Sequence, residues 1–325
     1  MRSTGTGLGL SIASHSGLPP AAMGELARDA EDAGFTAAFV AEGNGDALTL
    51  CHALIAATDS IAVGTAIANA ALRPPVLTAK TAVLLDDASG GRFRLGLGVA
   101  NAAKNAQSGL PALPPLRLAE EYVAVVRAVL AGGPGFSGEI FRTGHVPLDR
   151  PPHRPDLPVH LAALGPRMLR LAGRVADGVI LNLISPDQAA ESVAAVRRSA
   201  AEAGRDPADV EIACVVHIGL ADDPGAAARA ARAIVPRYAL HPAAPSLFGD
   251  PLTAVRNRLR EGDRAGAARQ VPQHVADGFV AHGDPAACHA RIEEYRKAGV
   301  DLPVLYPIPV DGVWPYADVI GRLAA

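Results

Sequence analysis

The chain has 325 residues, of which 49% are apolar and 19% charged, with a formal net charge of −3. This composition can fill a large core, and no basic stripe interleaved with aromatic residues points to a nucleic-acid partner. The three cysteines are far apart and form neither a disulfide framework nor a CxxC metal pair, so we expect a cytoplasmic protein. No apolar run reaches membrane-spanning length, so no membrane association is expected.

Short apolar runs alternate with amphipathic helical stretches along the chain. The first run follows a short N-terminal segment, but it is brief and broken by glycines, which favours a strand over a signal peptide. Strands alternating with helices predict a parallel sheet covered by helices. The eight expected strands are Leu8 to Ser14, Phe35 to Glu42, Ile61 to Asn69, Phe93 to Ala100, Leu157 to Leu164, Gly178 to Leu183, Val210 to Leu220 and Leu302 to Ile308.

The spacing lengthens in two places. After the fourth strand we expect a loop from Asn101 to Pro115, a helix over Arg117 to Leu130 and a hairpin within Gly132 to Pro152. After the seventh strand, a mostly helical region covers Pro224 to Ala268, and a last helix lies around Pro285 to Ala298. Eight units without a break favour a closed barrel over an open doubly wound sheet. The sequence therefore predicts an α/β fold, a (β/α)8 TIM barrel with insertions after strands 4 and 7, as a single domain over residues 1–325.

Polar residues gather where the expected strands end, which is where barrels of this class carry their active sites. The residues concerned are Ser14, His15, Glu42, Asn44, Asn69, Asn101, Asn182 and His217. His15 is a candidate for proton exchange near neutral pH, or else a hydrogen-bonded structural histidine. Glu42 is a candidate cofactor ligand or general acid/base, or else one half of an ion pair at the rim.

The junction from Leu164 to Met168 predicts a phosphate site. A strand ends, Gly165 allows a close turn, and a helix begins with Pro166 in its first turn. Free N–H groups and the positive end of the helix dipole suit a phosphate there, and Arg167 can add a charge-assisted bond. The alternative is a tight turn with a surface arginine.

Two other patterns are interpreted structurally. Gly96 to Asn101 resembles a dinucleotide fingerprint, but both of its glycines lie inside a strand, so we interpret them as small residues lining the barrel. His282, Cys288 and His289 do not share one helix face, so we expect a scattered surface set and no metal site.

At its strand ends the chain resembles the luciferase-like flavin and deazaflavin oxidoreductases. The stretches that carry the resemblance are Ala41 to Leu48, Val63 to Asn69, Ser89 to Gly98 and Leu157 to Met168. Together they look most like the deazaflavin branch, which uses coenzyme F420 and includes methylene-tetrahydromethanopterin reductase-like proteins. That family often carries a strained peptide bond near its third strand.

The resemblance implies a deazaflavin held at the carboxyl mouth of the barrel. By motif position, the residues near the ring system would be Glu42, Asn69, Val99, Ala100 and Asn101. Those near the phosphate-bearing tail would be Leu164, Gly165, Arg167 and Met168. The implied activity is hydride transfer between F420 and a small organic substrate, with His15 or Glu42 exchanging the proton. The alternatives are an FMN-dependent monooxygenase and a non-catalytic F420- or flavin-binding protein.

The chain also departs from its relatives. Gly43 stands where sugar-phosphate dehydrogenases of the family have a histidine, and Asn101 stands where they have a catalytic glutamate. Ser108-Gly109 replaces a His-Gly pair common in close relatives. We therefore do not expect sugar-phosphate oxidation by that pair. Relatives are often dimers, and outward helices rich in alanine are compatible with a homodimer.

Overall fold

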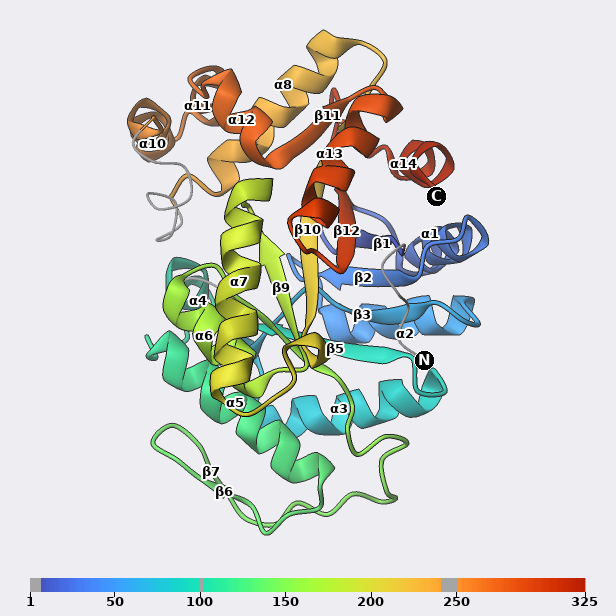
Figure 1. Ribbon diagram of the computed structural model, residues 1–325, viewed down its shortest axis with the longest axis vertical. Helices are drawn as coiled ribbons and strands as arrows, with labels where there is room; N and C mark the ends of the chain where they lie inside the picture. Colours follow the sequence, from blue (N-terminus) through green and yellow to red (C-terminus); the bar gives the residue numbers. More distant parts are fainter. Residues whose placement is uncertain (1–6, 100–101, 241–250, 325) are drawn as a thin grey trace.

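Parallel strands close into a barrel in the computed structural model, which describes residues 7–99, 102–240 and 251–324 (Figure 1). Each barrel strand pairs with the next along the chain, and the last, β12, pairs back with β1. The predicted (β/α)8 barrel is confirmed. Its strands are β1 (Gly9–Ala13), β2 (Ala37–Ala41), β3 (Ala62–Thr65), β5 (Phe93–Gly98), β8 (Val159–Ala162), β9 (Gly178–Asn182), β10 (Glu211–Leu220) and β12 (Leu302–Pro307).

Helices cover the outside of the barrel. Alternate strand residues such as Leu10, Ile12 and Val63 are buried against them, while the intervening positions face the barrel interior. Several helices begin with proline, whose missing N–H costs little in a first turn. The covering helices include α1 (Pro20–Asp32), α2 (Ala47–Ala57), α3 (Pro75–Ala88), α5 (Pro115–Leu130), α6 (Pro166–Val175), α7 (Pro186–Glu202), α13 (Pro285–Lys297) and α14 (Tyr316–Leu323).

The insertion after the fourth barrel strand contains α4 (Ala102–Gln107), α5 and a hairpin of β6 (Phe136–Ser137) and β7 (Arg142–Thr143). The hairpin is held by buried Glu121 of α5, whose carboxylate accepts the N–H groups of residues 139, 140 and 141 at 2.8–3.0 Å. The hairpin prediction is confirmed. The prediction of a continuous loop before α5 is wrong, because its first residues are helix formers, and the prolines that suggested a loop come only later.

The insertion after the seventh strand packs beside the barrel at the top of Figure 1. Its predicted helical character is confirmed, but the short strand β11 was not expected, because four residues give too weak a pattern. β11 pairs with β10 beyond the point where β9 ends. The elements are α8 (Pro224–Ile234), η3 (Val235–Arg237), α10 (Thr253–Arg260), α11 (Arg264–Arg269), α12 (Gln273–Phe279) and β11 (Val280–Gly283).

The expected third strand is interrupted. It divides into β3 and the two-residue β4 (Ala68–Asn69), and the peptide bond between Ala66 and Ile67 is cis. Gly64 pairs with Arg94 and Ala68 with Leu97, so three residues of the third strand lie opposite two of β5. This is a bulge, and a bulge removes ladder hydrogen bonds from the strands beside it.

A threonine side chain replaces the missing ladder bonds. The Thr65 hydroxyl donates to the carbonyl of Gly96 at 2.6 Å and accepts that residue's N–H at 3.0 Å. Gly96 has to be glycine, because a Cβ atom there would lie 1.8 Å from the Thr65 carbonyl oxygen. The interpretation of Gly96 as a small residue inside the barrel is therefore confirmed.

An ion pair lies across the amino end of the barrel. Arg94 and Glu211 occupy interior-facing positions, and an Arg94 Nη1 lies 2.7 Å from a carboxylate oxygen of Glu211. His160 Nε2 lies 3.5 Å from the same carboxylate, and burial lowers the pKa of this histidine. A ligand of the barrel is thus expected at its carboxyl end.

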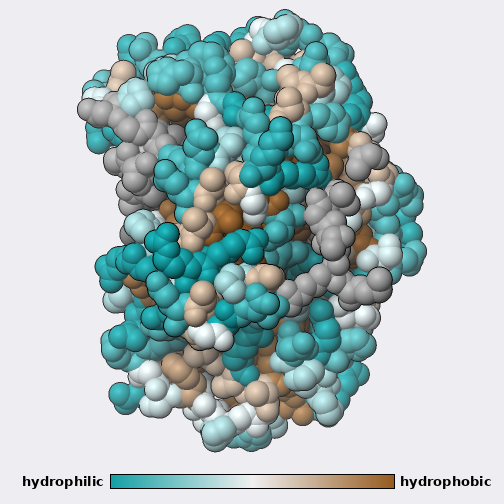
Figure 2. Space-filling model, viewed as in Figure 1, coloured by the Kyte–Doolittle hydropathy of each residue, from teal (hydrophilic) through white to brown (hydrophobic). Residues whose placement is uncertain are grey.

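The described helices include none that is both long and apolar enough to cross a membrane. The face shown in Figure 2 is mostly hydrophilic, with apolar side chains visible in small areas between polar ones.

The bulge gives a prediction about stability. We expect Thr65→Val, which keeps the volume, to lower the free energy of unfolding by about 2 kcal/mol, because the buried N–H and carbonyl of Gly96 lose their partner. Thr81→Val is the matched control, since the Thr81 hydroxyl bonds only the helix carbonyl of Leu77 and lies near the surface. Urea denaturation of both variants tests this, and equal stabilities would contradict it.

Candidate functional site at the carboxyl mouth of the barrel

A chain of hydrogen bonds joins the ends of the second, third and fourth barrel strands. The carboxylate of Glu42 accepts the backbone N–H of Asn69. The Asn69 side chain donates to Asn105 Oδ1 at 2.9 Å, and Asn105 donates to the carbonyl of Val99 at 3.1 Å. These bonds bring together three predicted site residues, Glu42, Asn69 and Val99. The residue that links them, Asn105 of α4, was not predicted from the sequence, because it lay in an expected loop.

Glu42 is held by backbone groups rather than by a cation. Its second oxygen accepts the N–H of Ala47, the first residue of α2, at 3.3 Å. Among the described residues it makes no ion pair. Burial raises its pKa, and the N–H groups of Asn69 and Ala47 oppose that shift. A carboxyl group whose pKa is raised can take up and release a proton closer to neutral pH.

His15 lies just after β1, next to the segment that follows Glu42. Its Nε2 lies 2.8 Å from Nη1 of Arg237 and 3.4 Å from the hydroxyl of Tyr306. A guanidinium has only donors, so this ring nitrogen accepts and the imidazole is neutral in this arrangement. An ideal Cβ at Gly43 would lie 2.5 Å from His15 Nδ1, so the glycine that departs from the relatives makes room for this ring.

Aromatic side chains surround His15, and most of them were missed from the sequence. The Trp314 ring packs edge to face against the His15 ring, with 5.7 Å between the ring centroids. It also stacks on the Tyr316 ring, with 5.6 Å between the centroids. Tyr306 lies between Trp314 and His217, at 6.2 and 5.1 Å. The signal was available, because Trp314 is the only tryptophan of the chain and follows the last strand, but no motif marked it.

His217 is buried in this cluster rather than placed at the surface of the mouth. Its Nε2 lies 3.3 Å from the Tyr238 hydroxyl, and its Nδ1 has no hydrogen-bond partner among the described residues. Burial, with a smaller contribution from Arg237, lowers its pKa to about 3. His217 is therefore neutral at physiological pH and is held as part of the wall.

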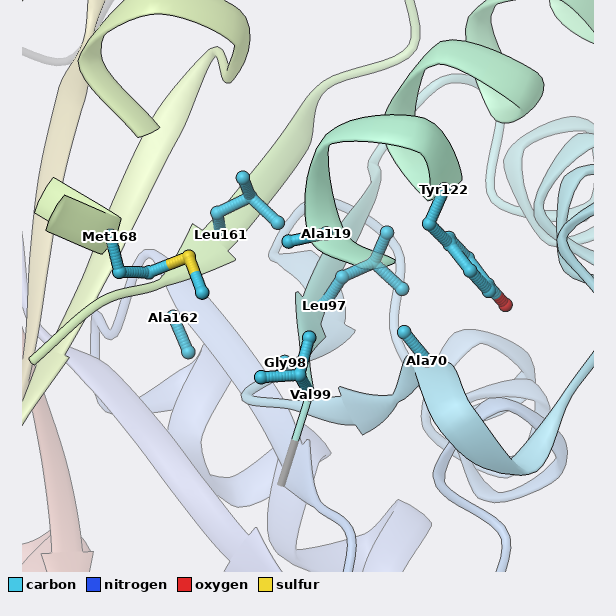
Figure 3. A pocket seen from close by; sticks show the side chains of 9 residues that line it. All are labelled: Ala70, Leu97, Gly98, Val99, Ala119, Tyr122, Leu161, Ala162 and Met168. Atoms are coloured by element: carbon cyan, nitrogen blue, oxygen red, sulfur yellow. The ribbon is translucent and has the colours of Figure 1, made fainter. Parts of the chain in front are cut away.

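A small apolar cavity lies beside the ends of the fourth and fifth barrel strands (Figure 3). Val99 and Met168, both predicted cofactor contacts, line it together with Gly98 and Ala162. Figure 3 shows the Met168 thioether directed toward these small residues. The hydroxyl of Tyr122 is directed away from the cavity and bonds Thr78 at 2.6 Å. The cavity, with a volume of about 10 Å³, has room for no more than a water-sized group, so a planar ring system would have to lie outside it, against the apolar surface of Val99 and Met168.

The predicted phosphate junction has the expected geometry. Gly165 occupies the N-cap position of α6 and supplies no side-chain cap, so the first N–H groups of the helix have no cap from it. Arg167 is exposed in the first turn and makes no ion pair with any carboxylate that the structure describes. Leu164 is half-buried immediately before the turn. Met168 joins this helix end to the apolar cavity.

Three other sequence predictions have different outcomes. Ala100 and Asn101, expected near the ring system, lie outside the described residues. Asn182 ends β9 with a buried side-chain oxygen that has no partner in the described part of the chain. The set of His282, Cys288 and His289 was expected at the surface, but Cys288 is fully buried in α13, on the helix face that packs inward, so that prediction is wrong for this residue.

Known proteins resemble the chain along its whole length. The luciferase-like monooxygenase family model matches residues 6–302. The 5,10-methylenetetrahydromethanopterin reductase of Methanolobus tindarius is 30% identical, covering 87% of this chain and 89% of that protein. The enzyme of the same name from Methanopyrus kandleri is 28% identical, covering 86% and 87%.

The fold also matches solved structures. The coenzyme F420-dependent tetrahydromethanopterin reductase from Methanopyrus kandleri superposes with a TM-score of 0.85 at 24% identity, covering 99% of both chains. An F420-dependent secondary alcohol dehydrogenase, in complex with an F420-acetone adduct, gives a TM-score of 0.80 at 20% identity, covering 99% of this chain and 100% of the other. At these identities the likeness concerns the fold.

The hydrogen-bond chain gives a second prediction. Asn69→Asp should lower the free energy of unfolding at pH 7 by about 3 kcal/mol. The oxygen that replaces the Asn69 amide nitrogen would face Asn105 Oδ1, and neither of these two oxygens carries a proton to donate. The loss should begin to shrink below about pH 6 and be mostly gone by about pH 4, since protonation restores a donor and a penalty of about 3 kcal/mol raises the pKa of the carboxyl by about two units in the folded state. Asn257→Asp on α10, where the exposed side chain accepts from Arg260, should change stability by less than about 0.5 kcal/mol. A pH-independent loss at residue 69 would contradict this account.

Proposed function

Because the chain belongs to the luciferase-like monooxygenase family, we propose that it is an F420-dependent oxidoreductase that transfers a hydride between the deazaflavin and a small organic substrate. Full-length relatives named methylenetetrahydromethanopterin reductases support this proposal, as does the match to a reductase described as coenzyme F420-dependent. The observation that carries it is the set of apolar side chains at the strand ends, Val99 and Met168 among them, beside the uncapped first turn of α6, to which Met168 itself belongs.

The residues present fit the group. Gly98, Val99, Ala162 and Met168 offer small or flexible apolar contacts to a planar ring. The N-terminus of α6 and Arg167 offer N–H donors and positive charge to a phosphate. The buried oxygen of Asn182 is an acceptor for which the described residues supply no donor.

When bound, the deazaflavin supplies two-electron hydride chemistry. The protein's own residues hold the reactants in place, exclude water and move the accompanying proton. We assign the proton exchange to His15 or Glu42. The raised pKa of Glu42 favours that role, but its two backbone bonds restrain it. His15 Nε2 accepts from Arg237 and lies 3.4 Å from the Tyr306 hydroxyl, and it can take up a proton when the Arg237 donor moves away.

We further propose that the protein works as a homodimer in the cytoplasm. Leu77 and Leu84 are 48% and 61% exposed and lie seven residues apart on one face of α3. Burying this face against a second copy of the chain would stabilise a dimer. The three cysteines are free and buried, as suits a reducing compartment.

Titration with F420 and, separately, with FMN tests the cofactor. We expect tight F420 binding, followed by its fluorescence, and weak FMN binding. Arg167→Gln should weaken F420 binding about tenfold by removing a charge-assisted bond, whereas Arg170→Gln, exposed one helical turn further along α6, should not. Preference for FMN would favour a monooxygenase, and binding of neither would overturn the proposal.

The proton-exchange role is tested on the same protein. His15→Gln combined with Glu42→Gln should abolish oxidation of reduced F420 by any substrate that the unmodified protein accepts, while F420 affinity changes little. Preserved turnover would remove both residues from the mechanism. Tight F420 binding without turnover in the unmodified protein would instead indicate a non-catalytic binding protein.

A further inference from the structure

Arg237 reaches the mouth of the barrel from the insertion after the seventh strand. It ends η3, whose other residues, Val235 and Pro236, are buried and anchor the segment. The next residue, Tyr238, is fixed through its hydroxyl to His217 inside the wall. From this anchored turn the guanidinium extends to His15, 222 positions away in the sequence. The insertion thus places a cation beside the proposed reaction site.

The charge of Arg237 is not neutralised by any carboxylate that the structure describes. Two other arginines of the insertion are paired with carboxylates: Arg229 lies 3.4 Å from Asp311, and Arg258 lies 3.6 Å from Glu261. Arg237 is exposed and bonds His15 through Nη1. A guanidinium carries five N–H donors in a planar fork, so others remain for a ligand.

Aromatic side chains lie around the histidine to which this cation bonds, and Tyr306 also hydrogen-bonds Arg237. Trp314 is half-buried and packs against both His15 and Tyr316, which fix its orientation. Tyr306 completes the wall, with its hydroxyl directed toward His15 Nε2. A cation beside a fixed aromatic face can bind a ligand that joins a planar apolar part to an anionic group.

We propose that Arg237 binds a carboxylate of the substrate whose planar part lies against Trp314. This rests on the proposed function and names its substrate class, planar organic carboxylates. One guanidinium matches the single charge and the two oxygens of a carboxylate in a bidentate pair. When the substrate carboxylate draws the Arg237 donor away, His15 Nε2 keeps the Tyr306 hydroxyl beside it and can exchange a proton with the bound substrate.

Trp314 provides the readout, because it is the only tryptophan of the chain. The protein, with and without F420, is titrated with benzoate and with benzamide, its neutral counterpart of similar shape, and tryptophan emission is followed. We expect a saturable response to benzoate at a concentration at least about tenfold lower than for benzamide. Arg237→Gln should abolish the preference, and Arg237→Lys should keep part of it, since lysine retains the charge without the fork.

Arg229→Gln is the matched control, an exposed arginine of the same insertion that is already paired, and it should keep the full preference. Circular dichroism and F420 affinity confirm that each variant is folded. The proposal would be overturned by equal responses to benzoate and benzamide, or by no response to either compound. It would also be overturned if Arg237→Gln still preferred benzoate. A benzoate preference in a protein that fails to bind F420 would keep the carboxylate site and remove only the proposed cofactor function.

Discussion

The hydroxyl of Thr65 fixes the register on which the mouth of the barrel depends. It bonds both backbone groups of Gly96 where the third strand carries one residue more than its neighbour. Had the pairing of Gly64 with Arg94 continued unchanged, Ala68 would lie opposite Gly98. The extra residue places Asn69 there instead, where Glu42 holds its backbone N–H and Asn105 holds its side chain. The bulge in the third strand thus sets how the ends of the second, third and fourth barrel strands are placed relative to one another.

The mouth that results has two different sides. One side, at the ends of the third to fifth barrel strands, presents small and apolar residues and continues to the uncapped start of α6. The other side, at the first, seventh and eighth strands, presents His15, the aromatic wall and the cation of Arg237. This division suits the proposed placement of a planar cofactor on one side and a charged substrate on the other, beside the imidazole to which we assign proton exchange.

The barrel was predictable because eight apolar runs alternate with helices, and that pattern is set by local burial. The residues of the first side were also found, because they sit in contiguous motifs at strand ends. The bulge and the residues around His15 were not found, because each depends on contacts between distant segments, and β11 was missed because its four residues are too few to give a pattern. Arg237 and Trp314 meet His15 across more than 200 positions of sequence, and no local pattern encodes that meeting. The functional roles of the site residues stay predictions.

Hydrogen exchange measured by mass spectrometry, with and without F420, tests most directly whether the mouth holds the deazaflavin. The account predicts slower exchange in peptides covering residues 66–69 and 164–168, and unchanged exchange in α13, which lies away from these strand ends. Tight F420 binding that left both of the first two segments unprotected would contradict the assigned site, even if the protein proved to be an F420-dependent enzyme.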